Sequence, residues 1–172
     1  MHSIESLIRS VADYPKLGVT FRDITPLLAD AEAFQAAIAA MAAPWTGQSI
    51  DQVAGLEARG FIFGVALAQQ LKAGFVPLRK PGKLPPPVRA LDYDLEYGSD
   101  RLEVREDALT PGSRVLLVDD VLATGGTLAA GRCLLESVGA SVIGASVLME
   151  LDALGGRQRW AAGSDIHALL HY

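Results

Sequence analysis

Residues 115–127, VLLVDDVLATGGT, constrain the fold more than any other stretch of the chain. They begin with a run of aliphatic residues, which predicts a buried strand. They end with a glycine-rich turn, and the next residues carry apolar side chains at helical spacing up to Gly139. A buried strand that passes through a tight turn into a helix is the repeating unit of α/β folds with a mainly parallel sheet.

Further predicted strands and helices alternate along the chain. Strands are predicted over residues 52–56, 75–78, 114–118 and 142–150. Helices are predicted over residues 3–13, 31–43, 60–74 and 127–138, from the spacing of their apolar side chains and the Pro or Gly that closes them. Because the predicted strands are continuously apolar, both faces of the sheet need cover, as in a parallel sheet flanked by helices. We therefore expect residues 1–172 to form one α/β domain.

Residues 79–112 interrupt this alternation. They are polar and rich in proline and charge, with alternating apolar side chains at 101–104. We predict two extended arms with a mobile tip. A connection of this length in a compact domain is usually functional.

Charge and cysteine content exclude several classes of protein. The net charge is −5, and the isoelectric point of about 5.1 argues against a nucleic-acid partner, whose binding surface would be basic. The one cysteine, Cys133, cannot form a disulfide within the chain. No secretory signal is recognisable, and no uncharged run of about 18 apolar residues exists that could span a membrane. We expect a cytoplasmic protein with no membrane partner.

The turn after the predicted strand is suited to binding a phosphate. It consists of Ala123, Thr124, Gly125, Gly126 and Thr127. Glycines let several backbone N–H groups face one point, and the start of the following helix adds unpaired N–H groups and two threonine hydroxyls. The turn has neither the lysine of a triphosphate loop nor a dinucleotide fingerprint, so a monophosphate fits best. The alternative is a structural turn in which Thr127 caps the helix.

Two adjacent carboxylates, Asp119 and Asp120, precede this turn. They would repel a phosphate, and consecutive strand residues point to opposite faces, which makes them a poor pair for acid–base work on one atom. They can accept hydrogen bonds from hydroxyls close to the phosphate, and a ribose diol is the obvious donor. A metal ion or a solvated surface pair are the alternatives.

The whole stretch resembles the phosphoribosyl-pyrophosphate (PRPP) signature of type I phosphoribosyltransferases. In that family the loop holds the 5′-phosphate and the two acidic residues contact the ribose hydroxyls. Residues 18–28, 55–64, 79–85, 95–98 and 147–156 resemble, in order and spacing, the adenine phosphoribosyltransferases. The resemblance implies transfer of phosphoribose from PRPP to adenine, giving AMP and pyrophosphate in purine salvage. It also implies a homodimer, and Mg²⁺ held mainly by PRPP oxygens.

Basic residues in this acidic chain are candidates for contacts with the diphosphate of PRPP. Arg59 follows a predicted strand and precedes a helix, where a positive charge opposes the helix dipole, so a purely structural role is disfavoured. By resemblance it lies beside the pyrophosphate and acts in catalysis. Arg79, Lys80 and Lys83 form a basic cluster at the end of another predicted strand. The alternative for the cluster is a solvated charge run.

The resemblance implies two mobile or peripheral parts, a small hood over residues 1–30 and a flexible lid over residues 80–110. In the lid, Glu96 would act as the acid–base residue on the purine side and Tyr97 would cover the substrates.

In the hood, the backbone near Val19 and Thr20 would read the adenine edge. Arg22 would anchor the hood or a dimer. Phe21 and Phe61 could pack on a purine or belong to the core.

Two other functions remain compatible with the signature. The chain could transfer phosphoribose to xanthine, guanine or hypoxanthine. It could also be a PRPP-sensing regulator without enzymatic activity, which would require a nucleic-acid surface that the acidic composition disfavours.

Overall fold

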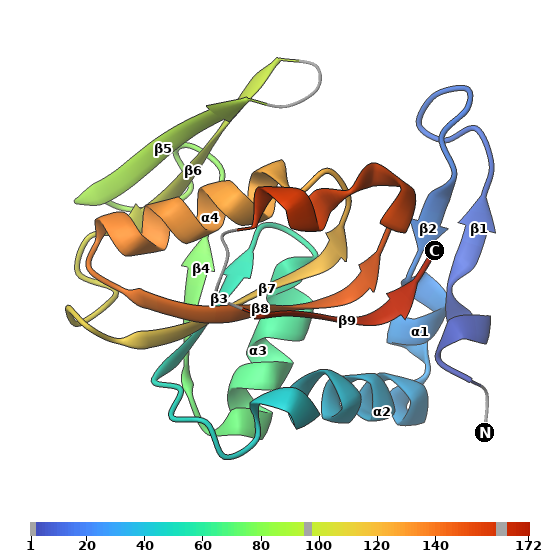
Figure 1. Cartoon of the computed structure of the whole chain (residues 1–172), viewed down its shortest axis with the longest axis horizontal. Coiled ribbons are helices and arrows are strands. Elements are labelled where there is room, and N and C mark those ends of the chain that lie inside the picture. Colours follow the sequence, from blue (N-terminus) through green and yellow to red (C-terminus); the bar gives the residue numbers. More distant parts are fainter. Residues whose placement is uncertain (1–2, 95–97, 161–164) are drawn as a thin grey trace.

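The computed structural model describes residues 3–94, 98–160 and 165–172, and its centre is a five-stranded, wholly parallel sheet (Figure 1). The strand order is β4-β3-β7-β8-β9. The bounds are β3 Gln52–Leu56, β4 Gly74–Leu78, β7 Arg114–Leu122, β8 Ser141–Glu150 and β9 Asp165–His171. The prediction of an α/β fold with a mainly parallel sheet is therefore confirmed.

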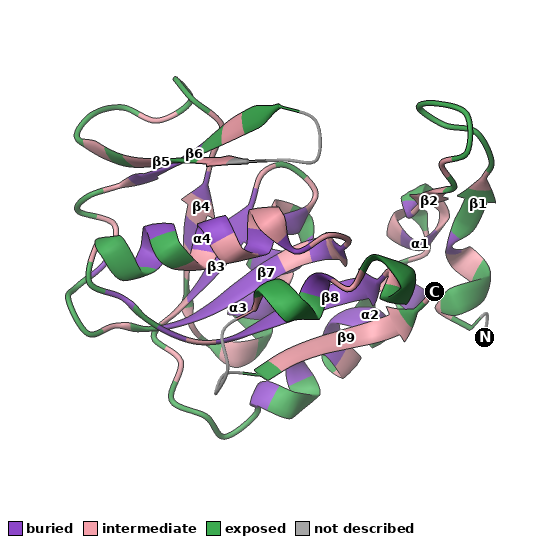
Figure 2. Cartoon of the chain, turned by 45° about the horizontal axis from the view of Figure 1, so that its top comes forward, coloured by how far each residue is buried: buried purple, intermediate pink, exposed green. Residues whose placement is uncertain are grey.

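Helices cover both faces of this sheet. On one face lie α2 (Ala31–Ala42) and α3 (Gly60–Leu71), and on the other lies α4 (Gly126–Ser137) (Figure 1). Figure 2 shows β7 and β8 buried along most of their length, whereas β9 at the sheet edge is only partly covered. The apolar runs of β7 and β8 thus supply side chains to a core on each face.

The predicted helix over residues 3–13 is wrong. The chain forms a single 3₁₀ turn, η1 (Glu5–Leu7), and then a short strand, β1 (Arg9–Val11). This strand pairs antiparallel with β2 (Phe21–Asp23), ahead of the short helix α1 (Thr25–Ala29). Pairing with Phe21–Asp23 overrode the local helical spacing. Residues 9–23 form a hairpin beside the sheet (Figure 1).

The two extended arms predicted within residues 79–112 are confirmed. They are β5 (Val88–Asp94) and β6 (Ser99–Arg105), an antiparallel pair that packs on α4. Backbone hydrogen bonds between Arg79 and Glu103 join β6 to the end of β4. The connection between the two arms includes residues 95–97, which lie outside the described residues, so the mobile tip stays a prediction.

Other boundaries differ in detail. β7 runs to Leu122, beyond the predicted end at residue 118, so both aspartates lie within the strand. Helix α3 ends at Leu71, where Lys72 adopts a left-handed conformation. β9 was not predicted. The remaining 3₁₀ turns are η2 (Ala43–Trp45), η3 (Asp152–Leu154) and η4 (Gly156–Arg159). No helix in the described part of the chain is long and apolar enough to cross a membrane.

The strand order places a ligand site between β3 and β7. From β3 the chain turns through α3 to β4 on one side, and from β7 it turns through α4 to β8 on the other. The loops that leave the carboxyl ends of β3 and β7 therefore diverge and leave a crevice between them. Ligands of open parallel sheets bind at such a reversal of strand order.

Candidate active site

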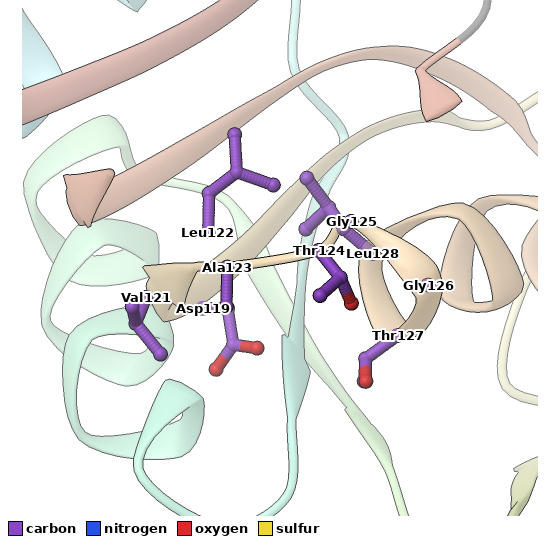
Figure 3. Close-up of a pocket in the computed structure, with 9 residues that line it drawn as sticks. All are labelled: Asp119, Val121, Leu122, Ala123, Thr124, Gly125, Gly126, Thr127 and Leu128. Atoms are coloured by element: carbon purple, nitrogen blue, oxygen red, sulfur yellow. The ribbon is translucent and has the colours of Figure 1, made fainter. Parts of the chain in front are cut away.

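The loop after β7 borders a cavity of about 130 Å³ (Figure 3). Asp119, Thr124 and Thr127 turn their side-chain oxygens to the same side of the loop. Helix α4 begins at Gly126, and its N-cap is Gly125, with no side-chain hydrogen bond capping the helix. The alternative in which Thr127 caps the helix is therefore wrong. The first N–H groups of α4 lack a side-chain cap and are available to an anion.

Gly125 is required by its surroundings as well as by its backbone. Its φ is +81°, a conformation that residues with a side chain rarely adopt. A Cβ at this position would collide with the carbonyl of Gly156, in η4. A Cβ on Gly156 would in turn collide with the carbonyl of Ala123. The two glycines thus allow η4 to pack directly against the backbone of the loop and hold it in place.

The two carboxylates lie on opposite sides of β7, as expected for consecutive strand residues. Asp119 borders the cavity at the loop, and Asp120 borders a second cavity beneath the hood. The start of α3 packs tightly against Asp119, since a Cβ on Gly60 would lie 2.9 Å from its Oδ1. Asp120 is 4% exposed, and its Oδ2 lies 3.0 Å from Nε of Arg59.

The surroundings raise the pKa of both acids. Burial, and then the neighbouring Asp120, raise the pKa of Asp119 well above its ordinary value. Burial also raises the pKa of Asp120, although the Arg59 guanidinium acts in the opposite direction. Two carboxylates on consecutive residues at the end of a largely buried strand are costly to keep ionised, and this pattern is typical of functional sites.

The second cavity has a volume of about 140 Å³ and is lined by the hood and by the ends of β7 and β8. The hood residues that the sequence predicted to contact the base line this cavity, and so do Arg59 and Asp120. Its full lining is Val19, Thr20, Phe21, Arg22, Arg59, Asp120, Val121, Ala123, Met149 and Leu151. The Arg59 guanidinium lies 5.3 Å from the centre of the Phe21 ring. The structure places Phe21 in this cavity, whereas Phe61 packs edge-on against Phe75.

The basic cluster at the end of β4 is held by acidic partners. Nε of Arg79 lies 3.2 Å from the Glu57 carboxylate, which also accepts a hydrogen bond from the backbone of Lys80. Lys80 itself pairs with Asp100 of β6 through its ammonium. Partial burial works to lower the pKa of Lys80, but the hydrogen bond to Asp100 holds it above the ordinary value. The backbone carbonyl of Lys83 accepts from Arg79. Hydrogen bonds and ion pairs from neighbouring residues thus hold Arg79 and Lys80 in place.

Tyr93 links this cluster to the loop after β7, residues 123–127, which is called the phosphate loop below. Its hydroxyl lies 3.2 Å from the Asp100 carboxylate and 3.5 Å from the Thr127 hydroxyl. Sequence reasoning missed Glu57, Tyr93 and Asp100. Tyr93 and Asp100 become opposite neighbours only when β5 and β6 pair in this register. Glu57 could have been identified from the sequence, because it is an acidic residue directly after a predicted strand and two residues before Arg59. Glu96 and Tyr97 lie outside the described residues, and their roles stay predictions.

Within the described ranges, Glu150, Asp152 and His171 form a cluster of three potential metal ligands whose ligand atoms lie within 4.8 Å of one another. The Arg157 guanidinium already occupies the Glu150 carboxylate at 2.7 Å. At the phosphate loop the acidic side chains are Asp119 and Asp120, and Asp120 is paired with Arg59. These donors suit a Mg²⁺ that arrives with a polyphosphate and takes few ligands from the protein.

Comparison with known proteins identifies the architecture. The phosphoribosyl transferase domain family matches residues 27–164. The adenine phosphoribosyltransferase of Symbiobacterium thermophilum is 57% identical over 168 residues, 98% of each chain. The crystal structure of adenine phosphoribosyltransferase from Thermoanaerobacter pseudethanolicus has a TM-score of 0.94 at 48% identity and covers 98% of both chains. The Saccharomyces cerevisiae enzyme, complexed with adenine and an imino-altritol bisphosphate, has a TM-score of 0.91 at 37% identity and covers 97% of this chain and 96% of its own.

These similarities extend over nearly the whole chain. The chain belongs to the phosphoribosyl transferase family and, within it, to the adenine phosphoribosyltransferases.

Proposed function

We propose that the chain transfers the 5-phosphoribosyl group of PRPP to adenine, giving AMP and pyrophosphate. One observation carries the proposal beyond family membership. The cavity at the phosphate loop and the cavity under the hood adjoin, because Val121 and Ala123 line both. Asp119 and Asp120 stand between them. A phosphate site, two carboxylates for hydroxyls and an apolar cavity, in that order, match the phosphate, ribose and base of a nucleoside monophosphate.

In this proposal the residues divide the substrate among them. The loop from Ala123 to Thr127 binds the 5′-phosphate through backbone N–H groups and hydroxyls. Asp119 and Asp120 accept hydrogen bonds from the ribose hydroxyls. Adenine enters beneath the hood, where the backbone of Val19 and Thr20 reads its edge.

The reaction is a displacement at C1′ with inversion. A ring nitrogen of adenine forms the new bond to C1′, and the electron pair of the broken bond leaves with pyrophosphate. Charge grows on that leaving group, so preorganised cations lower the barrier. Arg59 and the cluster of Arg79, Lys80 and Lys83 are the proposed cations, and Glu96 is the proposed acceptor for the purine proton. Tyr97 would cover the substrates.

Mg²⁺ bound to the diphosphate would neutralise part of its charge. The protein would add few direct ligands to the ion. A homodimer and a cytoplasmic location belong to the proposal as well. The first is supported by the family resemblance and the second by the single cysteine.

An assay with a panel of purines tests this function. Adenine, guanine, hypoxanthine and xanthine are each incubated with PRPP, with and without Mg²⁺, and nucleotide and pyrophosphate are measured. Adenine is expected to give the highest kcat/KM, and turnover is expected to require Mg²⁺. A higher kcat/KM for another purine would overturn the assignment. Binding of PRPP without turnover of any purine would indicate the regulator instead.

Lys80→Gln tests the basic cluster. Loss of one charge-assisted contact to the diphosphate costs about 1.5–3 kcal/mol, so KM for PRPP is expected to rise roughly 10- to 100-fold while KM for adenine stays unchanged. Lys72→Gln is the matched control, because Lys72 ends α3 at the far end from Arg59. Equal effects of both substitutions on PRPP would show that Lys80 does not contact the diphosphate.

A further inference from the structure

We infer that Tyr172 is a positioning residue for adenine, because its ring holds Arg22 and thereby fixes the hood over the base cavity. This inference rests on the proposed function, in which the cavity under the hood takes the base. Tyr172 does not line that cavity, so its effect would reach the base through Arg22.

The contact joins two parts of the chain that are far apart in sequence. The Arg22 guanidinium lies 3.9 Å from the centre of the Tyr172 ring, which is a close cation–π geometry. On the hood side, the same guanidinium donates a 2.6 Å hydrogen bond to the Ser10 hydroxyl. Ser10 and Arg22 are opposite neighbours in the β1–β2 pair. Arg22 therefore ties both hood strands to Tyr172.

The backbone of Tyr172 is bound to the segment Glu150–Asp152 at the end of β8. Its N–H donates to the carbonyl of Glu150 at 3.0 Å, and its carbonyl accepts from the N–H of Asp152 at 2.9 Å. Leu151, between these two residues, lines the base cavity. The ring also packs against the core on the α2 and α3 face of the sheet. Tyr172 thus connects Arg22, which lines the cavity from the hood, with the segment around Leu151, which lines it from the sheet.

The position of the hood depends on its contacts with the rest of the chain. Its two strands are three residues each, and a two-stranded ribbon has little stability of its own. Arg59 gives a second contact, 5.3 Å from the Phe21 ring. Since Val19 to Arg22 line the cavity, a hood that shifts relative to Leu151 changes the space available to a purine. The contact between Arg22 and Tyr172 does not involve the phosphate loop or the proposed diphosphate cations, so its loss should affect binding of PRPP far less than binding of adenine.

The aromatic face of Tyr172 carries the inferred role, and its hydroxyl does not. The hydroxyl is buried and has no hydrogen-bond partner among the residues that the structure describes. Replacing an unpaired buried hydroxyl by hydrogen is close to neutral or stabilising. Tyr172→Phe keeps the ring under Arg22, whereas Tyr172→Leu keeps apolar bulk and removes the π face. These two variants separate the cation–π contact from general packing.

Steady-state kinetics of both variants test the inference. For Tyr172→Leu, KM for adenine is expected to rise roughly 3- to 30-fold, the effect of one lost cation–π contact, while KM for PRPP changes less than about twofold. Tyr172→Phe is expected to restore KM for adenine to the wild-type value. Phe75→Leu is the matched control for lost aromatic packing, because Phe75 packs edge-on against Phe61 and lies in β4, at the sheet edge opposite β9 and Tyr172.

Each alternative outcome has a distinct meaning. If Tyr172→Leu raises both KM values equally, or leaves both unchanged, Tyr172 does not position the hood. The same conclusion follows if Tyr172→Phe behaves like Tyr172→Leu. Arg22→Gln combined with Tyr172→Leu should be no worse for adenine than the worse single variant, since both break the same contact. Failure of wild-type protein to use adenine would refute the proposed function, independently of the variants.

Discussion

An Asp119→Asn/Asp120→Asn variant is expected to keep its fold and to lose nearly all phosphoribosyl transfer. Hydrogen bonds to a charged acceptor contribute about 1.5–3 kcal/mol each, so loss of two predicts a fall in kcat/KM of roughly 10²- to 10⁴-fold. Steady-state kinetics with PRPP and adenine measure the fall. Circular dichroism confirms that the fold survives. Retention of activity within tenfold of wild type would show that the carboxylates do not hold the ribose.

The Asp119→Asn single variant tests how this acid makes the stability of the protein depend on pH. In the unfolded chain Asp119 titrates near 3.8, and in the folded chain burial and Asp120 raise its pKa well above that value. The folded state therefore binds this proton more tightly, and the protein loses stability as pH rises from about 4 through the raised pKa. At acid pH the protonated aspartic acid and asparagine are similar. The melting temperature of the variant minus that of wild type should therefore increase from acid to neutral pH. A difference that is constant or falls with pH would contradict this linkage.

The sheet could be predicted from the sequence because its strands are covered on both faces. Residues 52–56 coincide with β3, and the run that begins at residue 114 marks β7. β9 was missed because it lies at the sheet edge and is only partly buried, and His167 interrupts its apolar side chains. The strand at Arg9–Val11 was missed for a related reason. It exists only because it pairs with Phe21–Asp23, and its own spacing of apolar residues is helical.

The candidate site was predictable in its local parts and less so in its pairings. The loop and the acidic pair occupy one short stretch, so strand geometry alone could place the two carboxylates on opposite sides of β7. The partner of Asp120 is Arg59, and the partner of Lys80 is Asp100. These pairs depend on the order of strands in the sheet and on the register of β5 with β6. Neither is encoded in local spacing.

Gly125→Ala is expected to have the second largest effect, because it combines an unfavourable backbone with a collision. A side chain at a φ of +81° costs about 1–2 kcal/mol. In addition, the new Cβ would collide with the Gly156 carbonyl, so the loop or η4 must move. Displaced N–H groups would lose contacts to the 5′-phosphate that contribute about 1.5–3 kcal/mol each, and KM for PRPP should rise roughly 10- to 100-fold. Isothermal titration with PRPP and steady-state kinetics measure this.

Gly112→Ala distinguishes the collision from the backbone cost. Gly112 has a φ of +85°, yet a Cβ there would meet nothing within 4 Å. It should lower the melting temperature by a few degrees, for a cost of about 1–2 kcal/mol, and leave KM for PRPP unchanged. Gly156→Ala approaches the same contact from the other side, since its Cβ would collide with the Ala123 carbonyl. It should therefore weaken PRPP binding as Gly125→Ala does. If Gly112→Ala weakened PRPP binding equally, the effect of Gly125→Ala would reflect general destabilisation, and η4 would have no part in holding the phosphate loop.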